Sequence, residues 1–106
     1  MEHYFVFDSK GFSDYCYWQG QDKKILSRIN RLIQSIQRDG KGIGKAEVLK
    51  GDLKGCLSRR IDNEHRLVYQ FSSNSASRKV LILSCKEHYD KNISSKQKSL
   101  LQSLHI

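Results

Sequence analysis

The 106-residue chain has no proline and only three cysteines, Cys16, Cys56 and Cys85, which lie far apart. An odd number of cysteines without a Cys-x-x-Cys pair argues against a disulfide framework. Cys85 and His88 have the spacing of half a zinc site, but no second pair of ligands lies at a suitable distance along the sequence. The absence of proline agrees with a continuous structure without an internal linker. We therefore expect a chain that forms one domain and holds neither a metal nor another cofactor.

Long apolar runs are also missing. The longest are the four residues 4–7 and the four residues 80–83, whereas a helix that spans a membrane needs about 20. The first residues have neither a basic region nor a small-residue cleavage site, so they do not resemble a signal peptide. With 38% hydrophobic and 28% charged residues, the composition is that of a globular protein and excludes disorder of the whole chain. The sequence predicts a cytoplasmic protein with no membrane partner.

The charge is strongly one-sided, because 19 Lys and Arg residues against 11 Asp and Glu residues give a net charge of +8. Such an excess favours a polyanionic partner, and nucleic acid is the first candidate. A solvated basic surface on an unrelated small protein is an equally good explanation of charge alone. The choice between them therefore depends on a chemical site.

The first half of the chain is predicted to form one strand followed by two helices. Residues 3–8 are short and aromatic, which predicts a strand buried on both faces. A short helix is expected from Ser13 to about Gly20. Asp22 can cap a longer helix that ends before Gly40. The apolar residues of this longer helix recur on one face: Ile25, Leu26, Ile29, Leu32, Ile33 and Ile36.

The second half reads as four strands, over residues 46–50, 56–61, 65–71 and 80–86, which are separated by short turns. Connections this short allow hairpins and forbid parallel crossovers. The sequence thus predicts an α+β fold, with the first strand and two helices packed on one antiparallel sheet. After residue 89, the apolar residues of 90–106 form one stripe, which predicts an extra C-terminal helix over about 95–105.

Three arginines lie close to one predicted hairpin. Arg59 and Arg60 end one strand, and Arg66 begins the next after a turn at residues 62–63. Because side chains alternate along a strand, Arg59 and Arg60 point to opposite faces, and one of them can join Arg66 and Lys50 on a solvent-facing surface. Such a surface would fit a phosphodiester, although an ordinary hydrated sheet face has the same pattern.

A carboxylate and a histidine complete a set of groups that could act on RNA. Glu47 lies among Lys45, Lys50 and Lys54, and nearby cations favour its carboxylate form. His88 carries the side-chain type that titrates near neutral pH. A base for the 2′-OH, cations for the phosphorane and an acid for the leaving oxygen are what metal-free RNA cleavage needs. His65, in the turn, is as well suited to local hydrogen bonding as to catalysis.

Four motifs then carry a specific resemblance. They are Tyr-Trp-Gln at residues 17–19, Ser-Arg-Arg-Ile at 58–61, Glu-His-Arg-Leu-Val-Tyr at 64–69 and His-Tyr at 88–89. In this order and spacing, the chain closely resembles the YoeB toxins of the RelE superfamily over residues 3–89. The resemblance implies a toxin domain at residues 1–89 with a RelE-like fold, followed by an extension at 90–106.

The resemblance also implies an activity and its residues. The protein would be the toxin of a type II toxin–antitoxin pair, a ribosome-dependent endonuclease that cleaves mRNA in the ribosomal A site. Glu47 resembles the general base, Arg66 the stabiliser of the phosphate and its transition state, His88 the general acid and Tyr89 a positioning residue. The expected RNA- and phosphate-binding set is Lys45, Lys50, Lys54, Arg59 and Arg60, of which Lys50 and Arg60 match basic positions of the family.

The implied partners are mRNA, the ribosome and a YefM-like antitoxin, and a homodimer would be similar to family behaviour. Two other functions remain open. ParE-like toxins share the fold and act on DNA gyrase by binding, and a basic module could bind RNA without turnover. The combination of Glu47, Arg66 and His88 favours the nuclease over both.

Overall fold

The computed structural model describes residues 3–38, 46–71 and 79–86. The elements follow in the order β1 (Tyr4–Phe7), α1 (Ser9–Gln21), α2 (Lys23–Arg38), β2 (Glu47–Val48), the 3₁₀ turn η1 (Gly51–Leu53), β3 (Leu57–Arg60), β4 (Arg66–Phe71) and β5 (Lys79–Ser84). Several predictions lie outside the described residues: those for Gly40, Lys45, His88, Tyr89 and the helix at 95–105. None of the helices in the described ranges is long and apolar enough to cross a membrane.

The five strands form one sheet in the order β1-β5-β4-β3-β2. Strands β2 to β5 pair antiparallel with their neighbours, which confirms the predicted meander. Strand β1, in contrast, pairs parallel with β5, so the sheet is mixed and the prediction of an antiparallel sheet is wrong at this edge. Two helices separate β1 from the meander, so no hairpin turn fixes its direction.

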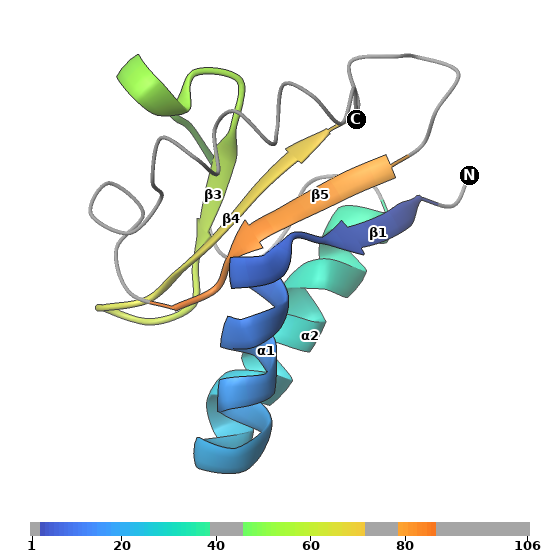
Figure 1. Ribbon diagram of the computed structural model, residues 1–106, viewed down its shortest axis with the longest axis vertical. Coiled ribbons are helices and arrows are strands. Elements are labelled where there is room, and N and C mark those ends of the chain that lie inside the picture. Colours follow the sequence, from blue (N-terminus) through green and yellow to red (C-terminus); the bar gives the residue numbers. More distant parts are fainter. Residues whose placement is uncertain (1–2, 39–45, 72–78, 87–106) are drawn as a thin grey trace.

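Strand β1 is an edge strand with only one covered face. Phe5 and Phe7 pack against the buried core, whereas Tyr4 is 70% exposed and Val6 is 36% exposed. The prediction that both faces are buried is therefore wrong. Both helices lie on the same side of the sheet (Figure 1), and β1 alternates between that covered side and the open one.

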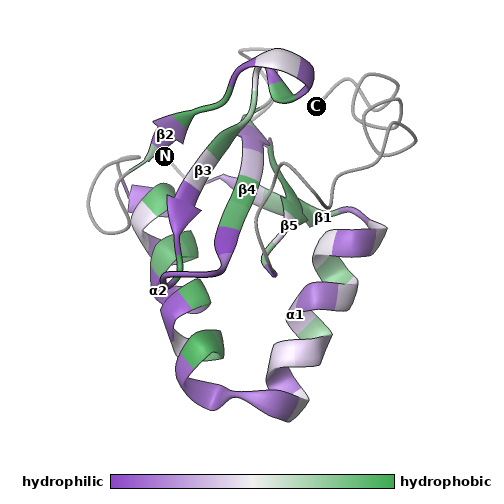
Figure 2. Cartoon of the chain, turned by 90° about the vertical axis from the view of Figure 1, so that its left-hand side faces the viewer, coloured by the Kyte–Doolittle hydropathy of each residue, from purple (hydrophilic) through white to green (hydrophobic). Residues whose placement is uncertain are grey.

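Helix α2 supplies much of the main core. Its buried residues Ile29, Leu32 and Ile36 pack with Trp18 of α1 and Ile82 of β5, and apolar segments recur along α2 in Figure 2. The predicted one-face spacing of α2 is confirmed. A second, smaller cluster contains Leu49, Leu53, Cys56, Val68, Leu81 and Leu83. Alternate residues of β4 and β5 thus serve two clusters, which places apolar side chains on both faces of the central strands.

The two helices begin at aspartates. Asp22 Oδ1 accepts from the backbone N–H groups of Lys24 at 3.0 Å and Ile25 at 3.2 Å, which confirms the predicted start of α2. Asp8 Oδ1 accepts from Gly11 N at 2.8 Å, so α1 begins at Ser9 and not at Ser13 as predicted. A cap of this kind is worth about 1 kcal/mol. The polar first turn of α1 hid this start, because it lacks an apolar repeat.

Helix α1 approaches the backbone of β5 so closely that only glycine fits at position 11. A Cβ atom there would lie 2.3 Å from the carbonyl oxygen of Ile82, whereas a Cβ at Gly20 of the same helix would meet nothing within 4 Å. We expect Gly11→Ala to lower the free energy of unfolding by about 1–3 kcal/mol, the usual cost of overpacking. Urea unfolding measures this loss.

Gly20→Ala is the matched control for that substitution. It changes the same residue type in the same helix, and it should raise the free energy of unfolding by up to about 1 kcal/mol through helix propensity alone. Effects of the same sign for the two substitutions would contradict the close packing of α1 on β5.

Candidate functional site

Strand register places several predicted site residues on one face of the sheet. Glu47 lies opposite Ser58 in the β2–β3 pair, and Arg60 lies opposite Arg66 in the β3–β4 pair. Directly opposed residues share a face, and so do residues two apart along a strand. Glu47, Ser58, Arg60 and Arg66 therefore lie on the same face. The ends of β3 and β4 beside their shared turn are hydrophilic in Figure 2.

Arg59 points to the other face, toward α2. Its side chain is buried, with 1% of the residue exposed. Its Nε donates to Tyr69 Oη at 3.1 Å, and its Nη1 donates to Ser35 Oγ at 2.9 Å. A guanidinium can be buried when it is hydrogen-bonded in this way. The position of Arg59 contradicts its predicted place in an exposed phosphate-binding patch, and Arg60 is the member of the pair that joins Arg66.

We expect Arg59→Ala to lower the free energy of unfolding by about 2 kcal/mol or more, because two buried hydroxyl groups, those of Ser35 and Tyr69, each lose a hydrogen bond. Arg60→Ala is the control, since it removes the same type of side chain from an exposed neighbour and should change stability by less than about 0.5 kcal/mol. Thermal or urea unfolding compares the two. Equal losses would show that Arg59 does not have this core role.

Arg66 lies at the start of β4 and is partly exposed. Its Nη1 donates to the backbone oxygens of Asp62 at 2.7 Å and His65 at 3.0 Å. Arg60 is exposed and lies opposite it. Two like charges directly opposed across strands repel each other, and an anion bound between them would relieve that repulsion. The pair is therefore a suitable place for a phosphate.

The remaining predicted groups within the described ranges are exposed, and Lys50 and Lys54 lie beyond the Val48–Leu57 pair, at the end of β3 away from the β3–β4 turn. Glu47 begins the two-residue strand β2 and is exposed. Lys50 is exposed and immediately precedes η1, and Lys54 is exposed and immediately follows it. Lys50 and Lys54 thus follow Glu47 closely along the chain, while the register separates them from the Arg60–Arg66 pair.

His65 has a local structural role. Its backbone N–H donates to Asp62 Oδ1 at 2.7 Å, and its ring lies edge-on to that of Trp18, with 4.8 Å between the ring centroids. The residue is buried, at 8% exposure. Its backbone hydrogen bond and its ring packing give His65 a structural role in the turn.

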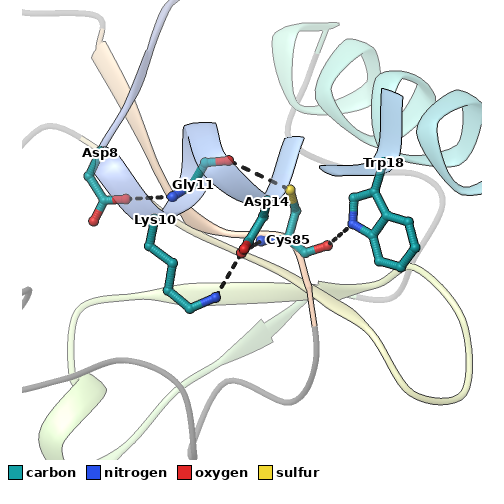
Figure 3. A network of polar contacts seen from close by, with 6 residues as sticks. All are labelled: Asp8, Lys10, Gly11, Asp14, Trp18 and Cys85. Atoms are coloured by element: carbon teal, nitrogen blue, oxygen red, sulfur yellow. Dashed lines mark hydrogen bonds and ion pairs between the residues drawn. The ribbon is translucent and has the colours of Figure 1, made fainter. Parts of the chain in front are cut away.

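A polar network that the sequence did not predict holds the end of β5 against α1 (Figure 3). Asp14 Oδ2 accepts from Cys85 N at 3.0 Å and from Lys10 Nζ at 2.9 Å. Trp18 Nε1 donates to the backbone oxygen of Cys85 at 2.8 Å. Both backbone polar groups of Cys85 are thus bound by α1, three residues before His88 in the sequence.

Burial in two different parts of the core disfavours the thiolate form of two of the cysteines. Burial, followed by the charge of Asp14, raises the pKa of Cys85 to about 12, and burial raises the pKa of the Cys56 thiol. Thiolates are the form that binds metals and attacks electrophiles. Among the residues that the structure describes, no three His, Cys, Asp or Glu side chains are grouped so that they could hold a metal ion.

The fold and this face define a class of protein: a small basic α+β protein of the RelE-like type, with two helices on one face of a sheet and, on the other, the exposed Arg60 opposite the partly exposed Arg66. Residues 7–89 match the family described as the YoeB-like toxin of the bacterial type II toxin–antitoxin system. Because this match spans most of the chain, the protein belongs to that family.

Individual relatives agree with this assignment. The toxin YoeB from Streptomyces coelicolor is 49% identical over 85 residues, which cover 79% of this chain and 96% of that protein. A solved YoeB–YefM complex from Staphylococcus aureus contains a chain that is 44% identical, with a TM-score of 0.72, and the alignment covers 84% of this chain and 100% of that one. A solved YoeB dimer from the same organism is 46% identical, with a TM-score of 0.73 and the same coverage.

Proposed function

We propose that the protein is a ribosome-dependent endoribonuclease that cleaves mRNA in the ribosomal A site and thereby inhibits translation. One observation carries the proposal: in a chain of the YoeB-like toxin family, the strand register brings Glu47, Arg60 and Arg66 onto the same sheet face. A carboxylate on the same face as two guanidinium groups has the chemistry that the 2′-OH and the phosphate of RNA require. The cytoplasm, where ribosomes work, is the proposed location.

In the proposed reaction Glu47 accepts the proton of the 2′-OH, and the 2′-oxygen forms a bond to phosphorus. The bond from phosphorus to the 5′-oxygen then breaks, which leaves a 2′,3′-cyclic phosphate and a 5′-OH. Arg66 stabilises the additional negative charge of the phosphorane. His88 donates the proton to the leaving 5′-oxygen, and Tyr89 helps to position the reacting groups. These last two roles rest on the resemblance of the His-Tyr pair at 88–89.

The cationic residues bind the RNA backbone around this site. Arg60 is exposed and lies opposite Arg66 in the sheet. Lys50 and Lys54 are exposed and follow Glu47 along the chain, and Lys45 is assigned to the same set from its sequence position. Each contact with a phosphate releases counterions, so binding should weaken steeply as salt is raised. Arg59 is left out of the set because it is buried.

The proposed protein partner is a YefM-like antitoxin. The similarity to the toxin chain in the Staphylococcus aureus YoeB–YefM complex supports this proposal. A homodimer is proposed on the similarity to the YoeB dimer from that organism. Antitoxin binding should block the nuclease, because release of the toxin from its partner is the regulated step of a type II system.

The test is to add purified protein to ribosomes that carry a defined mRNA with an open A site, and to map the RNA ends. We expect cleavage within the A-site codon, none of the same mRNA without ribosomes, and a cyclic phosphate at the new 3′ end. Cleavage should persist with EDTA under conditions that keep the ribosomes intact. Inhibition of gyrase supercoiling without RNA cleavage would instead support a ParE-like toxin, and RNA binding without cleavage would support a binding module.

A further inference from the structure

The turn between β3 and β4 is held by one carboxylate together with backbone hydrogen bonds. Asp62 Oδ1 accepts from two backbone N–H groups, those of Glu64 at 2.9 Å and His65 at 2.7 Å. On the other side of the turn, the backbone N–H groups of Ile61 and Asp62 donate to the backbone oxygen of His65 at 3.0 and 3.4 Å. The ring contact between His65 and Trp18 fixes this turn on the helix layer. An aspartate that accepts hydrogen bonds from the backbone N–H groups two and three residues later stabilises one turn conformation.

The turn presents two of its carbonyl oxygens to Arg66. Nη1 of Arg66 donates to both of them, the backbone oxygens of Asp62 and His65, at 2.7 and 3.0 Å. A guanidinium has five N–H bonds, of which Nη1 carries two. Nη1 therefore makes two bonds to the turn, whereas Nε and Nη2, on the opposite edge, make no hydrogen bond to any residue that the structure describes.

That opposite edge has the geometry of a phosphate site. Nε and Nη2 form the planar fork that binds two oxygens of one phosphate or carboxylate. Within the described part of the chain, the hydrogen bonds of Arg66 are those of Nη1 to the turn. A guanidinium held at Nη1 is oriented before the substrate arrives, which reduces the entropy cost of binding it.

The charge state of Asp62 supports this arrangement. Burial raises the pKa of Asp62, but the hydrogen bonds from the backbone N–H groups of His65 and Glu64, together with the charges of His65 and Arg66, lower it by more. The net pKa is below that of an ordinary aspartate. Asp62 is therefore an ionised hydrogen-bond acceptor at neutral pH.

We propose that Asp62 is a positioning residue for Arg66: it fixes the turn whose two carbonyl oxygens hold Nη1, and so directs the Nε and Nη2 edge at the scissile phosphate. This inference rests on the proposed function, in which Arg66 stabilises the phosphorane. Asp62 itself does not touch the RNA. Its effect should appear in the rate of the chemical step and not in the affinity for the ribosome.

Simple electrostatics predicts the opposite change in cleavage rate when Asp62 is replaced by a neutral residue. Removing an acid from a basic protein increases its attraction to RNA and should leave cleavage unchanged or faster. If Asp62 positions Arg66, its removal should slow cleavage, because a displaced catalytic group loses about 10- to 100-fold in rate. The direction of the effect therefore separates the two explanations.

The first experiment measures single-turnover cleavage of ribosome-bound mRNA at saturating protein. We expect Asp62→Ala to lose about tenfold or more in rate with unchanged affinity for the ribosome. Asp62→Asn should remain within about threefold of the wild type, since the amide oxygen can accept the same two hydrogen bonds. Glu64→Ala is the matched control, because it removes an acid from the same turn whose side chain is 75% exposed, and it should have no effect on the rate.

The second experiment repeats Asp62→Ala in an Arg66→Ala background. A residue that acts only through Arg66 has nothing left to position there, so the second substitution should not reduce the residual rate further. A loss equal to that seen in the wild-type background would overturn the proposal while leaving the proposed nuclease function intact.

A third measurement does not depend on activity. The Nε–H group of Arg66, assigned by its disappearance in Arg66→Lys, should show the ¹⁵N relaxation of a rigid group in the wild type and of a mobile group in Asp62→Ala. If the wild type fails to cleave mRNA, the proposed function is wrong, and this measurement alone decides the role of Asp62. An Arg66 Nε–H that is equally rigid in both proteins would overturn that role.

Discussion

Arg66→Ala should slow cleavage of ribosome-bound mRNA by about 10²-fold or more, the usual loss when a group that stabilises developing charge is removed. The structure gives the physical reason. Nη1 is bound to two backbone oxygens of the β3–β4 turn, so the remaining edge of the guanidinium is held in a fixed direction. The measurement is the single-turnover rate at saturating protein, with ribosome affinity measured separately.

Arg66→Lys and Arg60→Ala are the controls for this substitution. Lysine keeps the charge but lacks the planar fork, so Arg66→Lys should recover only part of the lost rate. Arg60→Ala removes the arginine directly opposite Arg66 on the same face and should weaken binding in a salt-dependent way. Equal, small losses for Arg66→Ala and Arg60→Ala would reduce both residues to general phosphate attraction.

The meander and α2 could be predicted because their signals are local. Short turns at residues 51–52 and 62–63 permit only antiparallel neighbours, and six apolar residues at helical spacing define the buried side of α2. The direction of β1 had no such signal, since two helices lie between it and the sheet. The start of α1 was also missed, because its cap at Asp8 precedes a turn without an apolar repeat.

For the candidate site, the sequence could predict only what the alternation of side chains along a strand determines. Alternation placed Arg59 and Arg60 on opposite faces of the sheet, but which of these faces α2 covers depends on tertiary packing and not on local sequence. Sequence patterns place charged residues outside, whereas Arg59 is buried against Ser35 and Tyr69. The bonds from α1 to Cys85 join residues 71 and 67 positions apart, and no local spacing indicates such a contact.

Loss of the proposed general base should have an equally large effect. Glu47→Gln should reduce the single-turnover rate by about 10²- to 10⁴-fold, the usual contribution of general acid–base catalysis. The substitution keeps the size of the side chain and removes the proton acceptor. Glu47 is exposed on a two-residue strand whose pairing with β3 uses the backbone, so the fold and its stability should be unchanged.

Charge makes this prediction sharper, because Glu47→Gln also removes one negative charge from a surface proposed to bind RNA. Affinity for the ribosome should therefore stay the same or increase, while the rate falls. Glu64→Gln neutralises another exposed glutamate, at the far end of β3 from Glu47, and should leave the rate unchanged. If Glu47→Gln retained a rate within about threefold of the wild type, the proton of the 2′-OH must go to another group, such as a base from the ribosome or from the RNA itself.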